Sequence, residues 1–226
     1  MRDLDPERPG PATAAEREEL FAVVYETNGW GRSPSGARYY SDSPPEASAP
    51  YSRYVSEFIG THDVESVVDL GCGDFEAARS IDLGRARYVG VDIYGDLVEH
   101  NRELYGSDRC EFAQADIVEG PLPEGQLCLI ALTLYIMSFA DVHRVLKNLR
   151  PYEFVLITDG QPELDPTARQ NIDKPTDKYT RQDYFGNGFW LELEPFSLPI
   201  EVMHDYVLPT GEHIRTVLWR PAETGL

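Results

Sequence analysis

The sequence predicts a doubly wound α/β fold, and three features of its pattern indicate this. Residues 66–70 form a short apolar run, Ser-Val-Val-Asp-Leu, that ends in a glycine-rich turn. Strand-like and helix-like segments then alternate from residue 87 to residue 158, and Asp92 closes the second predicted strand. Such alternation gives a parallel sheet with right-handed crossovers, in which ligands bind beyond the carboxyl ends of the strands.

The bulk composition sets limits on size, location and partners. The chain has 226 residues, which suits one α/β domain with insertions. Without a long apolar run or a signal-peptide region, we expect a soluble, cytoplasmic protein that does not bind membranes. The net charge of -19 argues against a nucleic-acid partner. The three cysteines, at 72, 110 and 128, have no paired spacing, so neither a disulfide framework nor a metal site is expected.

The N-terminal quarter predicts a cover for the sheet. Residues 1–15 are rich in Pro, Ala and charge and are expected to form a mobile arm. A helix is predicted from Glu16 to residues 28–29, and a second one starts at Pro50, so residues 16–62 would form a helical cover. The loop between the helices carries three aromatic residues that a purely solvated loop would not need: Trp30, Tyr39 and Tyr40.

Residues 66–92 form the predicted opening unit of the sheet. After the strand and the turn of Gly71 and Gly73, a helix is predicted to open at Asp74, followed by a strand that ends at Asp92. Asp92 lies 19 positions after Gly73, close to the ~20 residues at which a dinucleotide fold places a carboxylate on ribose hydroxyls. The spacing therefore predicts a nucleoside-containing cofactor.

The remaining chain continues the alternation and then closes the sheet. A predicted helix covers 97–105, and predicted strands cover 110–115, 127–134 and 153–158, with a helix at 139–149. Residues 159–199 break this rhythm and are predicted to be an insertion on the substrate side. The last two runs, 200–208 and 213–219, are separated by Pro-Thr-Gly-Glu and predict an antiparallel hairpin.

Asp74 narrows the choice of cofactor. A pyrophosphate site needs a third glycine and an uncluttered helix N-terminus, but Asp74-Phe75 occupies that position. A carboxylate here would repel a pyrophosphate and tolerate an ammonium or sulfonium group. The alternative is a glycine turn that only joins a strand to a helix.

The turn Asp-Leu-Gly-Cys-Gly, followed by Gly-Val-Asp, resembles the class I S-adenosylmethionine-dependent methyltransferases. A bacterial small-molecule or saccharide branch of these enzymes is also similar, through Trp30, Ser33-Pro-Ser35-Gly36, Cys72-Gly73-Asp74-Phe75, Leu122-Pro123, Asn171-Ile-Asp173, Gly188 and Pro195-Phe196-Ser-Leu-Pro199. The resemblance implies a Rossmann-like, mostly parallel seven-stranded sheet with an antiparallel last strand. It also implies S-adenosylmethionine as cofactor and S-adenosylhomocysteine as product.

The resemblance also implies roles for individual residues. Asp92 would accept both ribose hydroxyls, and Asp116 would receive the adenine amino group, unless it is only a helix or turn cap. The full expected cofactor set is Asp69, Gly71, Cys72, Gly73, Asp92, Ile93, Asp116, Ile117, Leu132 and Thr133, with Ser35 and Gly36 closing over the methionine moiety.

Catalysis is where the chain departs from the family pattern. The branch has an Arg-Asp pair after strand four and a His one helical turn later, where this chain has Ala131, Leu132 and Ile136. Either the base has moved, or alignment of an already competent nucleophile supplies the rate. Asp159, beyond the fifth predicted strand, is the first candidate base, and a turn aspartate before Gly160 is the alternative.

The acceptor is expected to be a small molecule enclosed by the N-terminal cover and the 159–199 insertion. Oxygen is the expected acceptor atom, with N-methylation of a small amine or a non-catalytic cofactor-binding module as alternatives. A homodimer is left open. Arg38 would bind an anionic group or only pair on the surface. The expected substrate residues are Tyr25, Trp30, Arg38, Tyr39 and Tyr40.

Overall fold

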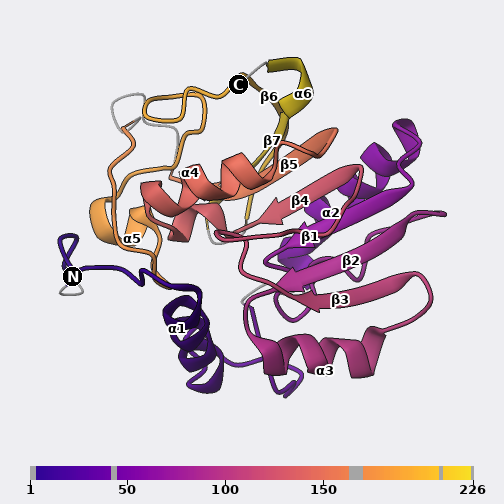
Figure 1. The fold of residues 1–226 in the computed structure, drawn as a ribbon, viewed down its shortest axis with the longest axis horizontal. Coiled ribbons are helices and arrows are strands. Elements are labelled where there is room, and N and C mark those ends of the chain that lie inside the picture. Colours follow the sequence, from indigo (N-terminus) through magenta and orange to yellow (C-terminus); the bar gives the residue numbers. More distant parts are fainter. Residues whose placement is uncertain (1–3, 42–44, 163–169, 209–210, 225–226) are drawn as a thin grey trace.

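A computed structural model of the chain describes residues 4–41, 45–162, 170–208 and 211–224. It contains a seven-stranded sheet in the order β3-β2-β1-β4-β5-β7-β6 (Figure 1). β7 runs antiparallel to β5 and β6, while the other neighbours pair in parallel. This confirms the predicted fold class. The strands are β1 Ser66–Leu70, β2 Arg87–Asp92, β3 Cys110–Gln114, β4 Leu127–Ala131, β5 Phe154–Gln161, β6 Ile200–Val207 and β7 His213–Trp219.

The core lies on both faces of the sheet because successive strand residues point to opposite faces. In β1, Val68 and Leu70 pack into the cluster that includes helix α4 (Phe139–Asn148), whereas Val67 packs into the cluster that includes α2 (Pro45–Thr61). The other helices are α1 Ala14–Glu26, α3 Gly95–Tyr105, η1 Leu134–Ile136, α5 Arg181–Phe185 and α6 Pro221–Thr224.

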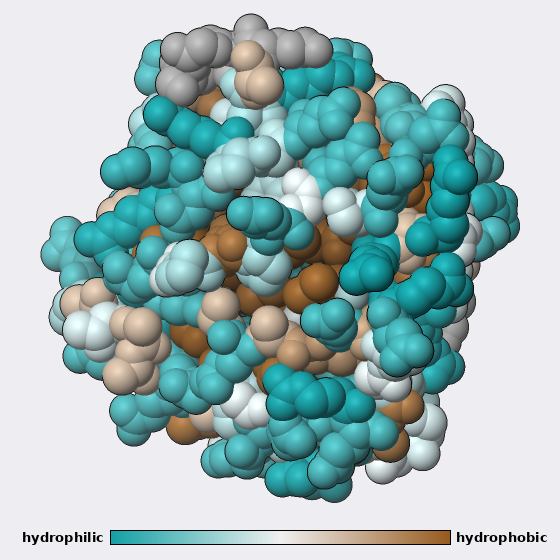
Figure 2. All heavy atoms as spheres, turned by 45° about the vertical axis from the view of Figure 1, so that its right-hand side comes forward, coloured by the Kyte–Doolittle hydropathy of each residue, from teal (hydrophilic) through white to brown (hydrophobic). Residues whose placement is uncertain are grey.

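The visible surface is mainly hydrophilic. Hydrophilic side chains cover most of the face seen in Figure 2, with apolar atoms visible in patches between them. Among the described ranges, no helix combines the length and the apolar character needed to span a bilayer.

Both N-terminal helices start earlier than predicted. A capping box of Thr13 and Glu16 starts α1 at Ala14, so the last two residues of the expected arm are helical. α2 begins at Pro45, where proline suits the first helical position, and Pro50 lies inside it. The predictions for residues 1–3, for positions 163–169 of the insertion and for the hairpin turn at 209–210 lie outside the described residues.

The prediction of a helix that opens at Asp74 is wrong. Phe75 takes a left-handed backbone conformation, with φ of 65°, which no α-helix can start from, and turns lead the chain to β2. The Phe75 ring instead packs on Tyr88, Tyr105 and Phe112, with ring centroids 5.1 to 5.2 Å apart. Aromatic packing has therefore replaced a helix at this position.

Two strand ends also differ from the prediction, and both differences affect the site. β4 stops at Ala131, because Leu132 has a φ of 52° and the 3₁₀ helix η1 follows. β5 extends to Gln161, because β7 supplies an antiparallel partner as far as the pair Gln161–His213. Asp159 thus lies within β5 rather than beyond it.

Candidate active site

A cavity of about 950 Å³ lies at the carboxyl ends of the parallel strands. The glycine turn after β1, the end of β2 and the segments after β3 and β4 form one half of its wall, which we call the cofactor half. The other half, the acceptor half, comes from η1, the end of β5, residues 178–183 and the β6–β7 hairpin. Ligands bind at this place in doubly wound sheets.

Asp92 is fixed at the end of β2 by backbone amides. Its Oδ2 accepts a hydrogen bond from the Gly73 amide at 3.1 Å, and its Oδ1 accepts one from the Tyr94 amide at 3.1 Å. Burial raises the pKa of Asp92 to about 6, although these amides oppose the shift. A carboxylate offers about four acceptor positions, more than these amides occupy, so acceptor capacity remains for the ribose.

Asp69 and Asp74 flank the same turn. The hydroxyl of Tyr88 donates to Asp69 Oδ2 at 2.7 Å, and the backbone amide of Ser41 donates to Asp74 Oδ2 at 3.1 Å. Burial raises the pKa of Asp69 to about 6 and also raises the pKa of Asp74. Three carboxylates around one turn suit a ligand with cationic groups, as the sequence predicted from Asp74.

The two glycines of the turn are required by close packing. Gly71 has a φ of 78°, and a Cβ there would lie 2.5 Å from Oγ1 of Thr133. Gly73 has a φ of 55°, and a Cβ there would lie 2.3 Å from Oγ of Ser41. The turn is thus in direct contact with the segment after β4 and with the N-terminal cover.

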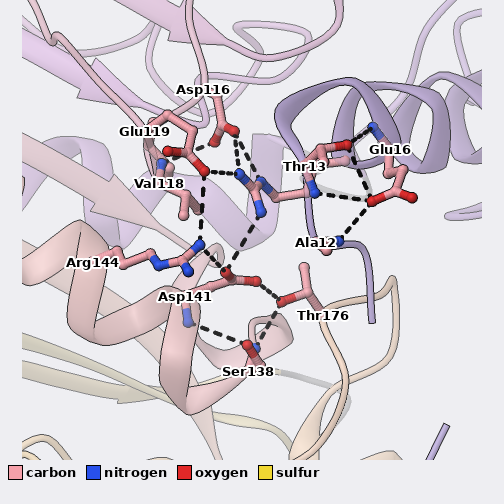
Figure 3. Close-up of polar contacts among 12 residues, drawn as sticks. Ala12, Thr13, Glu16, Asp116, Val118, Glu119, Ser138, Asp141, Arg144 and Thr176 are labelled. Atoms are coloured by element: carbon pink, nitrogen blue, oxygen red, sulfur yellow. Dashed lines mark hydrogen bonds and ion pairs between the residues drawn. The ribbon is translucent and has the colours of Figure 1, made fainter. Parts of the chain in front are cut away.

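The adenine end of the expected cofactor site is tied to α1 by a buried arginine. Arg17 Nε donates to Asp116 Oδ2 at 2.9 Å, and Nη2 donates to Glu119 Oε1 at 2.8 Å. Its Nη1 lies 3.6 Å from Oδ1 of Asp141, whose other oxygen accepts from the hydroxyl of Thr176 (Figure 3). Only 1% of the Arg17 side chain is exposed. One cation therefore joins α1, the segment after β3 and α4.

The alternative role of Asp116, a turn cap, is present in the structure. Its Oδ1 accepts the amide of Val118, two residues on, at 2.9 Å. Asp116 also lines the cavity beside Ile117, so its contact with adenine stays a prediction. The sequence reasoning missed Arg17, although Arg17 shares a helix face with Leu20, Phe21 and Val24 at positions i, i+3, i+4 and i+7.

All the predicted cofactor residues except Ser35 and Gly36 line the cavity. Those two lie in an exposed turn, where the amide of Gly36 donates to the Ser33 carbonyl at 3.0 Å. A Cβ at Gly36 would meet nothing within 4 Å. The expected closure over the methionine moiety is therefore not present at these residues, and Ser41 lies over the glycine turn instead.

The predicted substrate residues divide in the same way. Tyr25 and Trp30 line the cavity, with ring centroids 5.0 Å apart. Arg38 is exposed, with its guanidinium 4.9 Å from the centre of the Tyr39 ring. Tyr39 is buried in an aromatic cluster with Tyr25, and neither it nor Tyr40 reaches the wall. Tyr39 and Tyr40 therefore support the cover rather than face the cavity.

Asp159, the first candidate base, does not line the cavity. It borders a separate small space with Glu192 and Arg215, and it is 3% exposed. Burial raises its pKa to about 8, opposed by the backbone amides of Tyr135 and Thr133 and by the charge of Arg181. A carboxyl that is largely protonated at neutral pH and faces away from the cavity is poorly placed to remove a proton there.

Buried cations fasten the acceptor half. Lys174 Nζ donates to the carbonyl of Ile136 at 2.7 Å. Arg181 donates to the carbonyls of Tyr135 at 2.9 Å and Met137 at 2.7 Å, and it lies between the rings of Phe139 and Phe189. The three consecutive carbonyls of η1 and its C-cap are thus bound by side chains of the late segment. Within the described residues, His, Cys, Asp and Glu form no group of three suited to a metal ion.

Residues 68–152 match the family described as a methyltransferase domain. The chain has a class I S-adenosylmethionine-dependent methyltransferase domain. The predicted family and its cofactor, S-adenosylmethionine, are thereby confirmed. The carboxylates, glycines and apolar residues of the cofactor half fit that cofactor. Membership of the bacterial small-molecule or saccharide branch stays a prediction.

Curated relatives of the methyltransferase domain include fungal enzymes. A sterol 24-C-methyltransferase of Pneumocystis carinii is 27% identical over 164 residues, which cover 64% of this chain and 42% of the relative. A sterol 24-C-methyltransferase of Yarrowia lipolytica is 27% identical over 161 residues, which cover 62% of this chain and 41% of the relative. The chain thus spans about two fifths of the length of these relatives.

Solved structures share the fold at lower identity. Human N-acetylserotonin methyltransferase superposes with a TM-score of 0.57 at 17% identity, covering 90% of this chain and 59% of that one. Magnesium protoporphyrin IX methyltransferase of Synechocystis superposes with a TM-score of 0.55 at 10% identity, covering 92% of this chain and 100% of that one. These identities establish the common fold alone.

Proposed function

We propose that the protein transfers the methyl group of S-adenosylmethionine to a hydroxyl oxygen of a small molecule, such as a secondary metabolite or a saccharide unit. The open cavity carries this proposal. Its volume of about 950 Å³ lies at the upper end of the ~300–1,000 Å³ typical of ligand sites, so it has room for an acceptor beside the cofactor. A non-catalytic module with a filled acceptor site would lack this space.

The residues of the cofactor half bind and orient in this proposal. When bound, S-adenosylmethionine supplies an electrophilic methyl carbon on a cationic sulfonium. Asp92 holds the ribose, Ile117 packs on the adenine, and the buried carboxylates Asp69 and Asp74 balance positive charge near the turn. The apolar side chains of Leu132 and Ile136 keep water from the reacting centre. Alignment of acceptor and methyl carbon then lowers the barrier to displacement.

Two measurements test the proposal. Isothermal titration should show micromolar-range binding of S-adenosylmethionine or S-adenosylhomocysteine, and failure to bind either ligand would remove the proposal. Incubation of a small-molecule cell extract with methyl-labelled cofactor, followed by mass spectrometry, should reveal a labelled product. A site that binds cofactor and labels nothing would instead favour the non-catalytic module.

A carbon acceptor is the second candidate. Ala131, the last residue of β4, and Leu132 just after it are apolar, which would suit an alkene acceptor, and the curated relatives are sterol 24-C-methyltransferases. The chemical shift of the transferred methyl group in the product distinguishes oxygen, nitrogen and carbon acceptors. A methyl signal typical of a C-methyl group would replace the first candidate with the second.

A further inference from the structure

A lysine of the cavity wall, Lys178, reaches from the late segment (residues 170–199) to the N-terminal cover. Its ammonium donates a hydrogen bond to the backbone carbonyl of Gly29 at 3.1 Å, and both residues line the cavity. At its other end, the amide of the preceding residue, Asp177, donates to the carbonyl of Ile136 at 3.2 Å. Lys178 therefore connects the wall formed by η1 with the cover.

Positive charge in the cavity wall comes from two of its described residues, Arg17 and Lys178. The guanidinium of Arg17 is occupied by the carboxylates of Asp116, Glu119 and Asp141. Lys178, in contrast, forms no ion pair with any residue in the ranges that the structure describes. Its charge is therefore available to a ligand in the cavity.

A comparison with Lys174 shows how much of the Lys178 ammonium is unused. The Lys174 ammonium donates to two carbonyls and to the carboxylate of Asp177, which takes all three of its N–H donors. Within the described chain, the half-buried Lys178 donates to Gly29 alone. Lys174 thus fastens the structure with its whole ammonium group, whereas Lys178 keeps two N–H donors for another partner.

Aromatic side chains lie beside this ammonium and lead toward the glycine turn. The centre of the Tyr179 ring is 5.2 Å from Nζ of Lys178. In the cover, Trp30 packs against Tyr25 with ring centroids 5.0 Å apart, and the Tyr25 hydroxyl lies 3.2 Å from Oγ of Ser41, which covers the turn. Rings that displace water strengthen the attraction between a cation and an anion.

We propose that Lys178 binds an anionic group of the methyl acceptor, a carboxylate or a phosphate, an inference that rests on the proposed function. The acceptor is then a hydroxylated small molecule with a negative charge away from the hydroxyl that receives the methyl group. Asp183 and Glu212 add negative charge to the acceptor half. An anionic acceptor therefore needs the lysine to offset this repulsion and to supply charge-assisted hydrogen bonds.

The test divides the small-molecule extract by anion exchange at pH 8 into a retained, anionic fraction and a flow-through. With wild-type protein and methyl-labelled S-adenosylmethionine, the label should enter the retained fraction. Lys178→Gln keeps an N–H donor and loses the charge. It should raise the amount of the retained fraction that gives half-maximal transfer about 10- to 100-fold, the usual value of a hydrogen bond between charged groups. The maximal rate and the Kd for S-adenosylhomocysteine should stay near wild type.

Two further variants separate charge from structure. Lys178→Arg keeps both the charge and the N–H donors, so it should restore most of the lost transfer. Lys147→Gln removes the same charge from an exposed position of α4 and should behave as wild type. A lysine that only fastened the cover through Gly29 would instead change the maximal rate or the Kd for S-adenosylhomocysteine in Lys178→Gln.

Three outcomes overturn the inference. Label that enters the flow-through alone shows an acceptor without net negative charge, although methyl transfer itself stands. An unchanged half-maximal amount in Lys178→Gln shows that no acceptor anion binds there, and a raised Kd for S-adenosylhomocysteine in the same variant assigns Lys178 to the carboxylate of the cofactor. If the wild-type protein labels neither fraction, the proposed function fails and the inference fails with it.

Discussion

The two halves of the cavity hold their buried charges in opposite ways. In the cofactor half, carboxylates are bound by backbone amides, as Asp92 is by Gly73 and Tyr94. In the acceptor half, the cations Lys174 and Arg181 are bound by backbone carbonyls. The cofactor half therefore presents negative charge to a cationic ligand. The acceptor half uses Lys174 and Arg181 for structure and presents a mixture of tyrosine, apolar and polar side chains to the cavity.

The largest effect on stability is expected at Arg17. This buried cation binds carboxylates, and it lies beside the cofactor half. Arg17→Met should lower the free energy of unfolding by about 3–5 kcal/mol, because it removes the buried cation that pairs with Asp116 and Asp141, whose side chains are only 8% and 7% exposed. Urea unfolding measures this. Arg85→Met is the control, since Arg85 and Asp63 form an exposed pair at 3.9 Å. An equally small effect of both variants would contradict the role of Arg17.

The next largest effect tests whether the amide-bound carboxylate of the cofactor half holds the cofactor. Asp92→Ala should raise the Kd for S-adenosylhomocysteine about 100-fold, because two charge-assisted hydrogen bonds are lost. Asp92→Asn keeps one carbonyl oxygen and should give a smaller loss. Calorimetric titration measures both, with the exposed turn residue Asp82→Ala as control. Unchanged binding in Asp92→Ala would place the ribose elsewhere.

A third effect extends the comparison to pH, because Asp159 is a buried carboxyl on β5, just behind the acceptor half. Its pKa is about 8 in the folded protein and ~3.9 when unfolded, so the folded protein keeps a proton that the unfolded chain releases. The resulting stability is complete below pH ~4 and is lost as pH rises through 8, by at most about 1.4 kcal/mol per pH unit.

Asp159→Asn should remove this pH dependence. The difference in unfolding free energy between pH 5 and pH 8, measured by urea unfolding, should be smaller in the variant than in the wild type. Methyl transfer should persist, since Asp159 faces away from the cavity. Loss of transfer with intact cofactor binding would restore Asp159 as a candidate base.

The smallest effect concerns the cover over the glycine turn. Ser41 Oγ accepts the amide of Asp74 at 3.0 Å and lies 3.2 Å from the hydroxyl of Tyr25. Ser41→Ala should cost about 1 kcal/mol of unfolding free energy, the usual value of such a hydrogen bond. Ser35→Ala, in the exposed part of the same segment, should leave both stability and cofactor binding unchanged.

The cofactor half could be predicted from sequence because its contacts are local or follow from strand order. Asp92 binds the amide of Tyr94 two residues away, and the spacing from Gly73 to Asp92 is that of one strand-turn-strand unit. The parallel sheet follows from the same alternation. The helix after Asp74 could not be excluded, because the left-handed Phe75 depends on ring contacts with residues in other elements.

The acceptor half could not be predicted because its contacts are long-range. Lys174 reaches the carbonyl of Ile136 across 38 positions, and no sequence pattern marks a carbonyl as a partner. Glu212 stands beside Gly160 only because β7 inserts next to β5. The misplaced Asp159 has the same cause, since the added length of β5 depends on its pairing with β7.

The fastening of η1 has a consequence for how this protein can change its specificity. Lys174 and Arg181 donate hydrogen bonds to the main-chain carbonyls of residues 135–137. A main-chain carbonyl is the same whatever side chain its residue carries. Substitution of Tyr135 or Ile136 therefore leaves these carbonyl hydrogen bonds in place, although Ile136 also packs in the core. Divergence or redesign of this wall can alter which acceptor fits while the cofactor stays where it is.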